Sequence, residues 1–186
     1  MEHVEPYYPE RPERPARTVA MYHGLGGRPT RWEDRMLRRA GFSDVIFDHI
    51  DYDREWFRDE CRSLFRRELA KIRRADVIIG ISLGGYMAYL LAQATGKDLI
   101  MINPSLDREK TKLDIKHFNT GDIGNHFNRV EIYFGELDEL IPMDNQVNFL
   151  NRNHITYNAW IVNGMEHCPY MQEFELILAN SPIVND

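Results

Sequence analysis

The chain has 186 residues, of which 43% are hydrophobic and 28% are charged, a composition typical of one globular domain. Its formal net charge is −6 and it has no basic tract, which argues against a nucleic-acid partner. No apolar run is long enough for a transmembrane helix and no apolar signal core stands near the start, so we expect no membrane partner either.

The first residues indicate where the folded domain begins. Residues 5–17 contain four prolines among Glu and Arg, so residues 1–17 are expected to form an extended or disordered arm and residues 18–186 a single domain.

The two cysteines, Cys61 and Cys168, are far apart and form no C-x-x-C motif. Reduced thiols and a cytoplasmic location are expected.

From residue 18 onward, short apolar runs alternate with longer amphipathic segments. The expected strands are 19–22, 45–47, 77–81, 99–102, 132–134 and 160–162. The expected helices are 30–40, 55–72, 83–94, 144–151 and 170–179. Continuous apolar strands that alternate with helices predict an α/β fold with a mostly parallel sheet of about six strands and helices on both faces.

Gly80 to Gly84 form a G-x-S-x-G motif between an apolar strand and an apolar helix. In that setting the serine, Ser82, lies on a sharp turn that exposes its hydroxyl, and the flanking glycines let strand and helix approach closely. The context therefore predicts a nucleophile elbow, whereas the five letters alone would be weak evidence.

A serine hydroxyl needs a histidine to accept its proton and an acid to orient that histidine. In the α/β-hydrolase order these partners follow the serine as acid and then histidine, each after a strand. His167 is the histidine of the seven that lies beyond the last expected strand and before the last helix. Asp138 follows the fifth strand, and Glu136 and Glu139 compete with it in the same loop.

The glycine-rich segment His23 to Gly27 follows the first strand. In this fold such a loop supplies one backbone N–H of an oxyanion hole and the residue after the nucleophile supplies the other, which would be Leu25 and Leu83. A phosphate-binding loop is the alternative, but the segment lacks the lysine and the glycine spacing of the known phosphate motifs.

With these features the chain resembles the compact YqiA-like esterases of the α/β-hydrolase superfamily. The shared motifs are His23-Gly24, Ser82-Leu83-Gly84-Gly85-Tyr86, Asn103-Pro104, Asp138-Glu139 and Gly164-x-x-His167. The resemblance implies a triad of Ser82, Asp138 and His167 and six strands in the order 2-1-3-4-5-6. The segment 105–129 is short and polar where larger relatives build a helical lid, so we expect a minimal lid.

Several further residues near these motifs are candidates for other roles. We expect His23, Gly24, Tyr86 and Met165 to contact the substrate, although His23 could instead pack under its loop. Cys168 stands beside His167, but a buried thiol is the expected role because Ser82 occupies the elbow.

A metal site is a weaker alternative. Asp48, His49, Asp51 and Asp53 follow the second strand, but acids in such a loop are more often solvated. No metal and no cofactor are expected.

The sequence thus predicts a serine hydrolase, in the carboxylesterase class, that cleaves a small short-acyl ester or thioester through an acyl-enzyme. An amidase or peptidase with the same triad stays open, because the leaving group is chosen by pocket shape. A binding module that keeps the fold without turnover is the alternative from another class.

Overall fold

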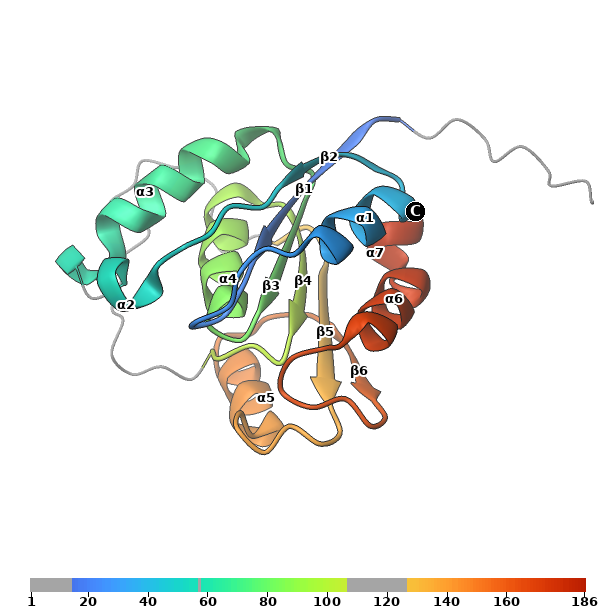
Figure 1. Ribbon diagram of the computed structural model, residues 1–186. Helices are drawn as coiled ribbons and strands as arrows, with labels where there is room; N and C mark the ends of the chain where they lie inside the picture. The colour runs from blue at the N-terminus through green and yellow to red at the C-terminus, as the bar shows by residue number, and fades with distance from the viewer. Residues whose placement is uncertain (1–14, 57, 107–126) are drawn as a thin grey trace, which may run out of the picture.

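The computed structural model describes residues 15–56, 58–106 and 127–186. Within these residues the chain forms one parallel sheet between two layers of helices (Figure 1). The expected N-terminal arm lies outside the described residues up to residue 14, and so does most of the expected minimal lid, residues 107–126.

The sheet has six strands in the order β2-β1-β3-β4-β5-β6, and every neighbouring pair is parallel. This confirms the predicted strand order. The strands are β1 (Arg17–Tyr22), β2 (Phe42–Ile46), β3 (Val77–Ile81), β4 (Asp98–Ile102), β5 (Val130–Gly135) and β6 (Asn158–Val162).

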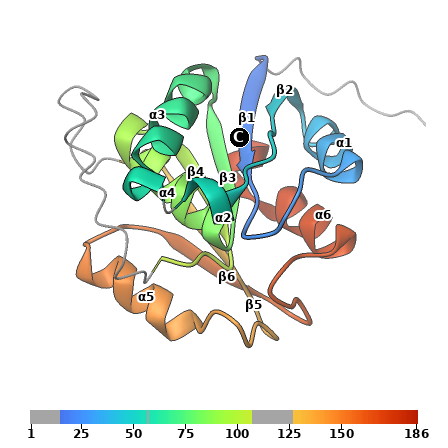
Figure 2. The ribbon, with the colours of Figure 1, turned by 60° about the vertical axis from the view of Figure 1, so that its left-hand side comes forward.

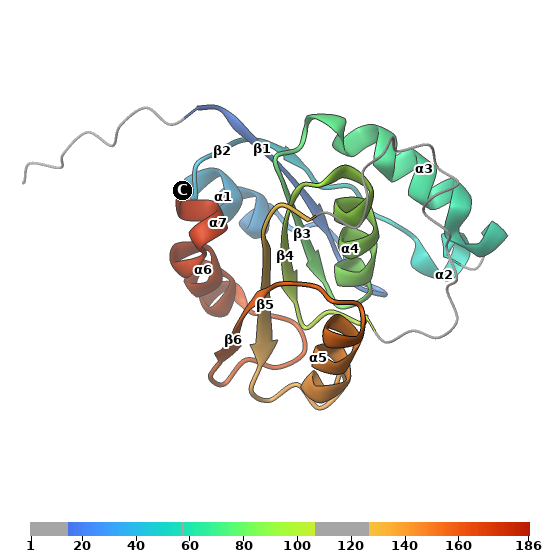
Figure 3. The same cartoon turned by 180° about the vertical axis from the view of Figure 1, so that it is seen from behind.

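The helices cover both faces of the sheet, as Figures 1 and 3 show from opposite sides. The α-helices are α1 (Arg31–Arg39), α2 (Tyr52–Glu55), α3 (Arg62–Lys71), α4 (Leu83–Thr95), α5 (Met143–Arg152), α6 (Met171–Asn180) and α7 (Pro182–Asn185). Two 3₁₀ turns, η1 (Arg58–Cys61) and η2 (Ile72–Arg74), flank α3.

Alternation along the central strands divides the core in two. In β3, Ile78 faces a cluster that contains α3 and α4, whereas Val77 and Ile79 face a second cluster with α1, α6 and α7. Successive side chains of a strand point to opposite faces, so an unbroken apolar run is required where both faces are covered. All five residues of β3 are buried, as this arrangement demands.

The expected single helix at 55–72 is wrong. The chain instead forms α2, η1, α3 and η2 in succession. The break falls at Cys61, which has a left-handed backbone with φ of 68° and cannot continue a right-handed helix. The apolar stripe is kept, since Leu64, Phe65 and Ile72 are all buried.

The strands run in one direction, so their carboxyl ends gather at one edge of the sheet and their amino ends at the other. In Figure 1 the arrowheads point toward the carboxyl edge, and the C-terminus lies at the opposite end of the molecule. Figure 2, seen from another side, keeps α1 and α6 together on one face and α3 and α4 on the other. Ligand sites of open parallel sheets lie beyond the carboxyl ends of the strands.

None of the helices in the part of the chain that the structure describes is both long and apolar enough to cross a membrane.

Candidate active site

Ser82 lies in the turn between β3 and α4 and has a strained backbone, with φ of 55°. Its N–H donates to the carbonyl oxygen of Ile102 at 3.1 Å, and its own carbonyl oxygen accepts from the Ser105 N–H at 3.0 Å. A left-handed serine is uncommon, and such strain persists only where neighbouring structure enforces it. The predicted sharp turn between strand and helix is therefore present, and Ser82 is half-buried at the carboxyl edge.

Two glycines permit the close approach of strand, helix and loop around Ser82. A Cβ at Gly84 would lie 2.2 Å from the carbonyl oxygen of Tyr22, which is backbone and cannot swing aside. A Cβ at Gly24 would lie 2.8 Å from the Cβ of Ser82. The loop after β1 is thus packed directly against the serine, and larger residues at these positions would push it away.

The side chains of Ser82, His167 and Asp138 form a continuous hydrogen-bonded chain. His167 Nε2 lies 2.9 Å from Ser82 Oγ, and His167 Nδ1 lies 2.9 Å from Asp138 Oδ2. The carboxylate can only accept, so the imidazole proton lies on Nδ1 and leaves Nε2 free to accept from the serine hydroxyl. The three residues come from three different loops, after β3, β5 and β6.

The loop after β5 distinguishes Asp138 from its two acidic neighbours. Asp138 is 2% exposed at its side chain, and its second oxygen, Oδ1, accepts from the N–H groups of Leu140 and Ile141. Glu136 accepts from the Gly164 N–H instead, and Glu139 is exposed. Of the three acids, the structure brings Asp138 to His167.

The loop after β1 turns tightly, with the Gly27 N–H donating to the Gly24 carbonyl at 3.0 Å. Among the hydrogen bonds between described residues, neither the Leu25 nor the Leu83 N–H has a partner. Leu83 is the first residue of α4, where N–H groups are unpaired and the helix dipole favours negative charge. Both amides therefore remain available as donors, as an oxyanion hole requires.

Two contacts hold the side chain of His23. Its Nε2 lies 3.2 Å from Glu33 Oε2, and its ring stacks on Phe47 at 5.0 Å between centroids. Glu33 is buried at the start of α1, where it also forms a capping box with Thr30. These contacts fit the alternative in which His23 packs under its loop, and Gly24 is the residue of the pair that touches Ser82.

Met165 and Tyr86 require a correction. Met165 is fully buried among core residues that include Phe174, and Tyr86 is 6% exposed in the other cluster. The Tyr86 ring stacks on Tyr89, with centroids 6.3 Å apart. Neither side chain has the exposed surface that the predicted substrate contact needs, because both complete the packing of the helices against the sheet.

Cys168 follows His167, and the expectation of a buried thiol is wrong, because the residue is exposed at the surface. Its pKa is nevertheless raised, mainly by partial loss of solvent around the thiol, and the negative charges of Asp138 and Glu33 act in the same direction. A raised pKa keeps the thiol protonated and poorly nucleophilic near neutral pH. The thiol thus lacks the activation that a competing nucleophile would need.

Carboxylates of the acidic loop after β2 form hydrogen bonds with other residues of the protein. Asp48 accepts from Lys71 Nζ at 2.8 Å, and Asp51 accepts from the Arg54 N–H at the start of α2. Within residues 15–56, 58–106 and 127–186, no group of three His, Cys, Asp or Glu side chains is placed to hold a metal ion.

The family comparison matches residues 23–129, more than half of the chain, to the "Uncharacterised protein family (UPF0227)". The chain belongs to this family. The match begins at His23 and includes Ser82, and together with the fold it confirms the predicted resemblance to the YqiA-like α/β-hydrolases. None of the curated proteins with which the sequence was compared matches it.

Solved structures with the same architecture are distant in sequence. A protein of the α/β-hydrolase superfamily from Xanthomonas campestris pv. campestris has a TM-score of 0.62 at 18% identity, over 88% of this chain and 98% of that one. S-formylglutathione hydrolase (FrmB) from Staphylococcus aureus has a TM-score of 0.63 at 16% identity, over 95% and 84%. FphF, a fluorophosphonate-binding serine hydrolase of the same organism, has 0.59 at 15%, over 97% and 88%. At these identities the similarity shows the α/β-hydrolase fold alone.

Asn103 belongs to the site, although the sequence predicts nothing for it beyond an Asn-Pro step. The structure places its side chain between the loops that carry Asp138 and His167. A polar residue directly after a buried strand, followed by proline, was the signal available in the sequence.

Proposed function

We propose that this protein is a serine hydrolase that cleaves small, short-acyl esters or thioesters through an acyl-enzyme on Ser82. The observation that carries the proposal is the chain of two 2.9 Å hydrogen bonds from Ser82 Oγ through His167 to Asp138. The α/β-hydrolase fold supports it, because that fold places a nucleophile, an acid and a histidine on these same strand ends.

In the acylation step His167 Nε2 takes the proton of Ser82 as Oγ attacks the carbonyl carbon of the substrate. The carbonyl π electrons move to oxygen, and the N–H groups of Leu25 and Leu83 stabilise the resulting oxyanion. One such donor typically contributes about 3 kcal/mol to the transition state. The oxyanion then collapses, the bond to the leaving alcohol or thiol breaks, and His167 returns the proton to that group.

Deacylation repeats the sequence with water. His167 removes a proton from water as the oxygen attacks the acyl carbon, and the proton passes to Ser82 Oγ as the acyl bond breaks. Asp138 keeps its charge throughout and stabilises the imidazolium. The two N–H groups that hold Asp138 Oδ1 leave Oδ2 free for His167, so the acid is positioned before substrate binds.

The preference for short acyl groups follows from where the apolar side chains lie. Met165 is buried in the core, whereas Leu137 and Leu140 of the Asp138 loop are 54% and 67% exposed. A long acyl chain gains about 0.8 kcal/mol for each CH₂ that it buries, and these outward-facing leucines offer it little enclosed surface. Acetyl to butyryl esters are therefore the expected substrates.

The test is hydrolysis of p-nitrophenyl esters from acetate to decanoate by the wild type, Ser82→Ala and Ser43→Ala. Ser43 is an exposed serine in β2 that bonds the Arg17 carbonyl, and it serves as the matched control. We expect Ser82→Ala to lose roughly 10⁴-fold or more in turnover, and Ser43→Ala to lose none.

Three results would contradict the proposal. Turnover above one tenth of the wild-type value in Ser82→Ala would show that Ser82 is not the nucleophile. A kcat/KM that rises steadily from butyrate to decanoate would remove the short-acyl preference. Hydrolysis of p-nitroanilides at rates that match the esters would favour an amidase.

A further inference from the structure

Asn103 is the first residue after β4 and lies at the centre of the carboxyl edge. It is 1% exposed, and its backbone is left-handed, with φ of 42°. Asparagine is one of the few residues with a side chain that adopts this conformation readily. The turn sends the chain from β4 into Pro104 and directs the carboxamide toward the neighbouring strand ends.

The carboxamide connects the two loops that carry the histidine and the acid. Its Oδ1 accepts from the Gly135 N–H at 2.6 Å, at the end of β5 and three residues before Asp138. Its Nδ2 donates to the carbonyl oxygens of Glu166 and His167, at 2.8 and 2.9 Å. The partners fix the orientation of the amide, because an N–H can only donate and a carbonyl can only accept.

The same short segment also holds the nucleophile. The carbonyl oxygen of Ile102 accepts from the Ser82 N–H, and the Ser105 N–H donates to the Ser82 carbonyl oxygen, at 3.1 and 3.0 Å. The backbone N–H of Asn103 itself donates to Tyr133 in β5 at 2.9 Å. The segment 102–105 therefore contacts the backbone of all three loops that carry Ser82, Asp138 and His167.

We propose that Asn103 is a positioning residue of the triad, which sets the spacing between the His167 loop and the Asp138 loop through its carboxamide. The inference rests on the proposed function and goes beyond it, because Asn103 does not reach the reacting atoms itself. Both hydrogens of Nδ2 are used on the backbone of the histidine loop, so losing them frees that loop. A displacement of about 1 Å in such a site can cost about 10²-fold in rate.

The test compares Asn103→Asp with Asn185→Asp. Aspartate keeps the shape of asparagine and tolerates the left-handed backbone, but places a carboxylate oxygen against the two carbonyls. Asn185, at the opposite end of the molecule, donates through Nδ2 to the carbonyls of Leu178, Ala179 and Ser181. The control thus loses the same kind of hydrogen bond without touching the triad.

We expect Asn103→Asp to lower kcat about 10²-fold with KM changed less than threefold, and Asn185→Asp to leave both unchanged. A second readout is the downfield proton resonance of His167 Nδ1–H, which reports its hydrogen bond to Asp138. That resonance should weaken or shift in Asn103→Asp and stay in Asn185→Asp. A purely stabilising role would lower the melting temperature without moving either readout.

Asn103→Gly is a second variant in case Asn103→Asp does not fold. Glycine relieves the left-handed backbone strain while it removes the carboxamide. Folded Asn103→Asp and Asn103→Gly proteins with kcat within threefold of wild type would overturn the inference. Loss of fold in both variants at the assay temperature would assign Asn103 to stability and also overturn it. A wild type that hydrolyses no ester would refute the proposed function, an outcome distinct from an active Asn103→Asp.

Discussion

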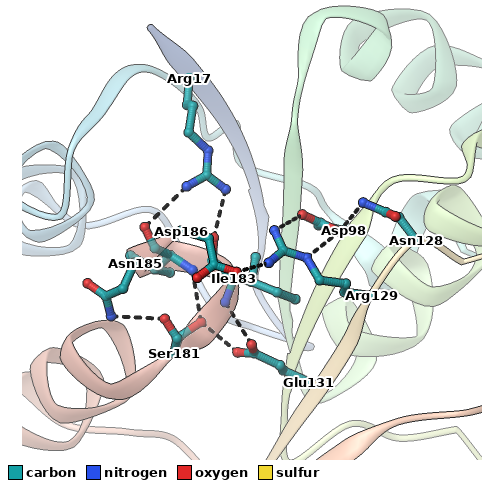
Figure 4. Close-up of polar contacts among 10 residues, drawn as sticks. Arg17, Asp98, Asn128, Arg129, Glu131, Ser181, Ile183, Asn185 and Asp186 are labelled. Atoms are coloured by element: carbon teal, nitrogen blue, oxygen red, sulfur yellow. Dashed lines mark hydrogen bonds and ion pairs between the residues drawn. The ribbon is translucent and has the colours of Figure 1, made fainter. Parts of the chain in front are cut away.

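The two edges of the sheet use the same kinds of side chain for different purposes. At the amino edge, Glu131 of β5 is buried and accepts from the Ser181 hydroxyl and the Ile183 N–H (Figure 4). At the carboxyl edge the side chain of Asp138 is also buried, but one of its oxygens faces His167. A buried carboxylate whose partners are backbone and hydroxyl groups stabilises the fold, whereas a buried carboxylate that faces an imidazole can support proton transfer.

The amino edge also joins the last residues of the chain to the sheet. Arg129 forms an ion pair with Asp98 at 2.6 Å and another with Asp186, the last residue. Arg17 of β1 donates to the carbonyl oxygens of Ile183 and Val184 in α7 (Figure 4). Backbone strain is absent from these residues, whereas Ser82 and Asn103 at the carboxyl edge both have left-handed backbones. A positive φ is not confined to the carboxyl edge, since His154 in the loop before β6 has φ of 56°. At Ser82, however, the strain falls on a residue of the candidate site, where such strain is commonly found.

Among the substitutions that compare the two edges of the sheet, Asp138→Asn should have the largest effect on kcat. The amide can hold His167 in the wrong tautomer and cannot stabilise its cation, so we expect kcat to fall roughly 10³–10⁴-fold with little change in stability. Steady-state kinetics with p-nitrophenyl acetate measure it. Glu136→Gln is the control in the same loop and should lose less than threefold. A severe loss of kcat in Glu136→Gln with a mild loss in Asp138→Asn would assign the acid of the triad to Glu136 instead.

The reverse pattern is expected from Glu131→Gln. Its new amide hydrogens would face the donors of Ser181 and Ile183, and we expect a loss of about 2 kcal/mol in the free energy of unfolding. For a chain of this size that lowers the melting temperature by about 4–8 °C. Thermal unfolding followed by circular dichroism measures it, with the exposed Glu175→Gln as control. An unchanged melting temperature with reduced kcat would mean that the amino edge takes part in catalysis.

The smallest effect concerns Cys168, which lies beside the triad without a proposed role in it. Its raised pKa means that the protonated thiol, the unreactive form, persists to higher pH than in an ordinary cysteine. Alkylation by iodoacetamide should therefore be slower than that of glutathione at pH 8 and should accelerate only at higher pH. Cys168→Ser should keep at least half of the esterase activity. Rapid alkylation at pH 7 that abolishes hydrolysis in the wild type but not in Cys168→Ser would contradict the low reactivity of the thiol.

The sequence was sufficient where local pattern and chain order determine structure. Continuous apolar runs such as Val77 to Ile81 are required of strands covered on both faces, and the helix expected at 30–40 is found as α1, with Thr30 as its N-cap. Ser82, Asp138 and His167 could be found because each follows a strand, and the carboxyl ends of parallel strands meet at one edge.

The sequence was insufficient where the outcome depends on packing between distant segments. Met165 precedes His167 by two residues, but nothing in the sequence shows that its side chain turns into the core beside Phe174. Cys61 adopts a left-handed backbone that its residue type does not favour, so the break before α3 was missed. The role of Asn103 exists only once the ends of β4 and β5 and the histidine loop come together.

The most direct test of the account is covalent labelling with a fluorophosphonate probe, followed by peptide mass spectrometry. A phosphonyl group on Ser82 in the wild type would show that this hydroxyl is activated, because an ordinary serine does not react. We expect the adduct on the peptide that contains Ser82, with none in Ser82→Ala and strongly reduced labelling in His167→Ala. An unlabelled wild type, or an adduct on another residue that persists in Ser82→Ala, would contradict the assignment of Ser82 as the nucleophile.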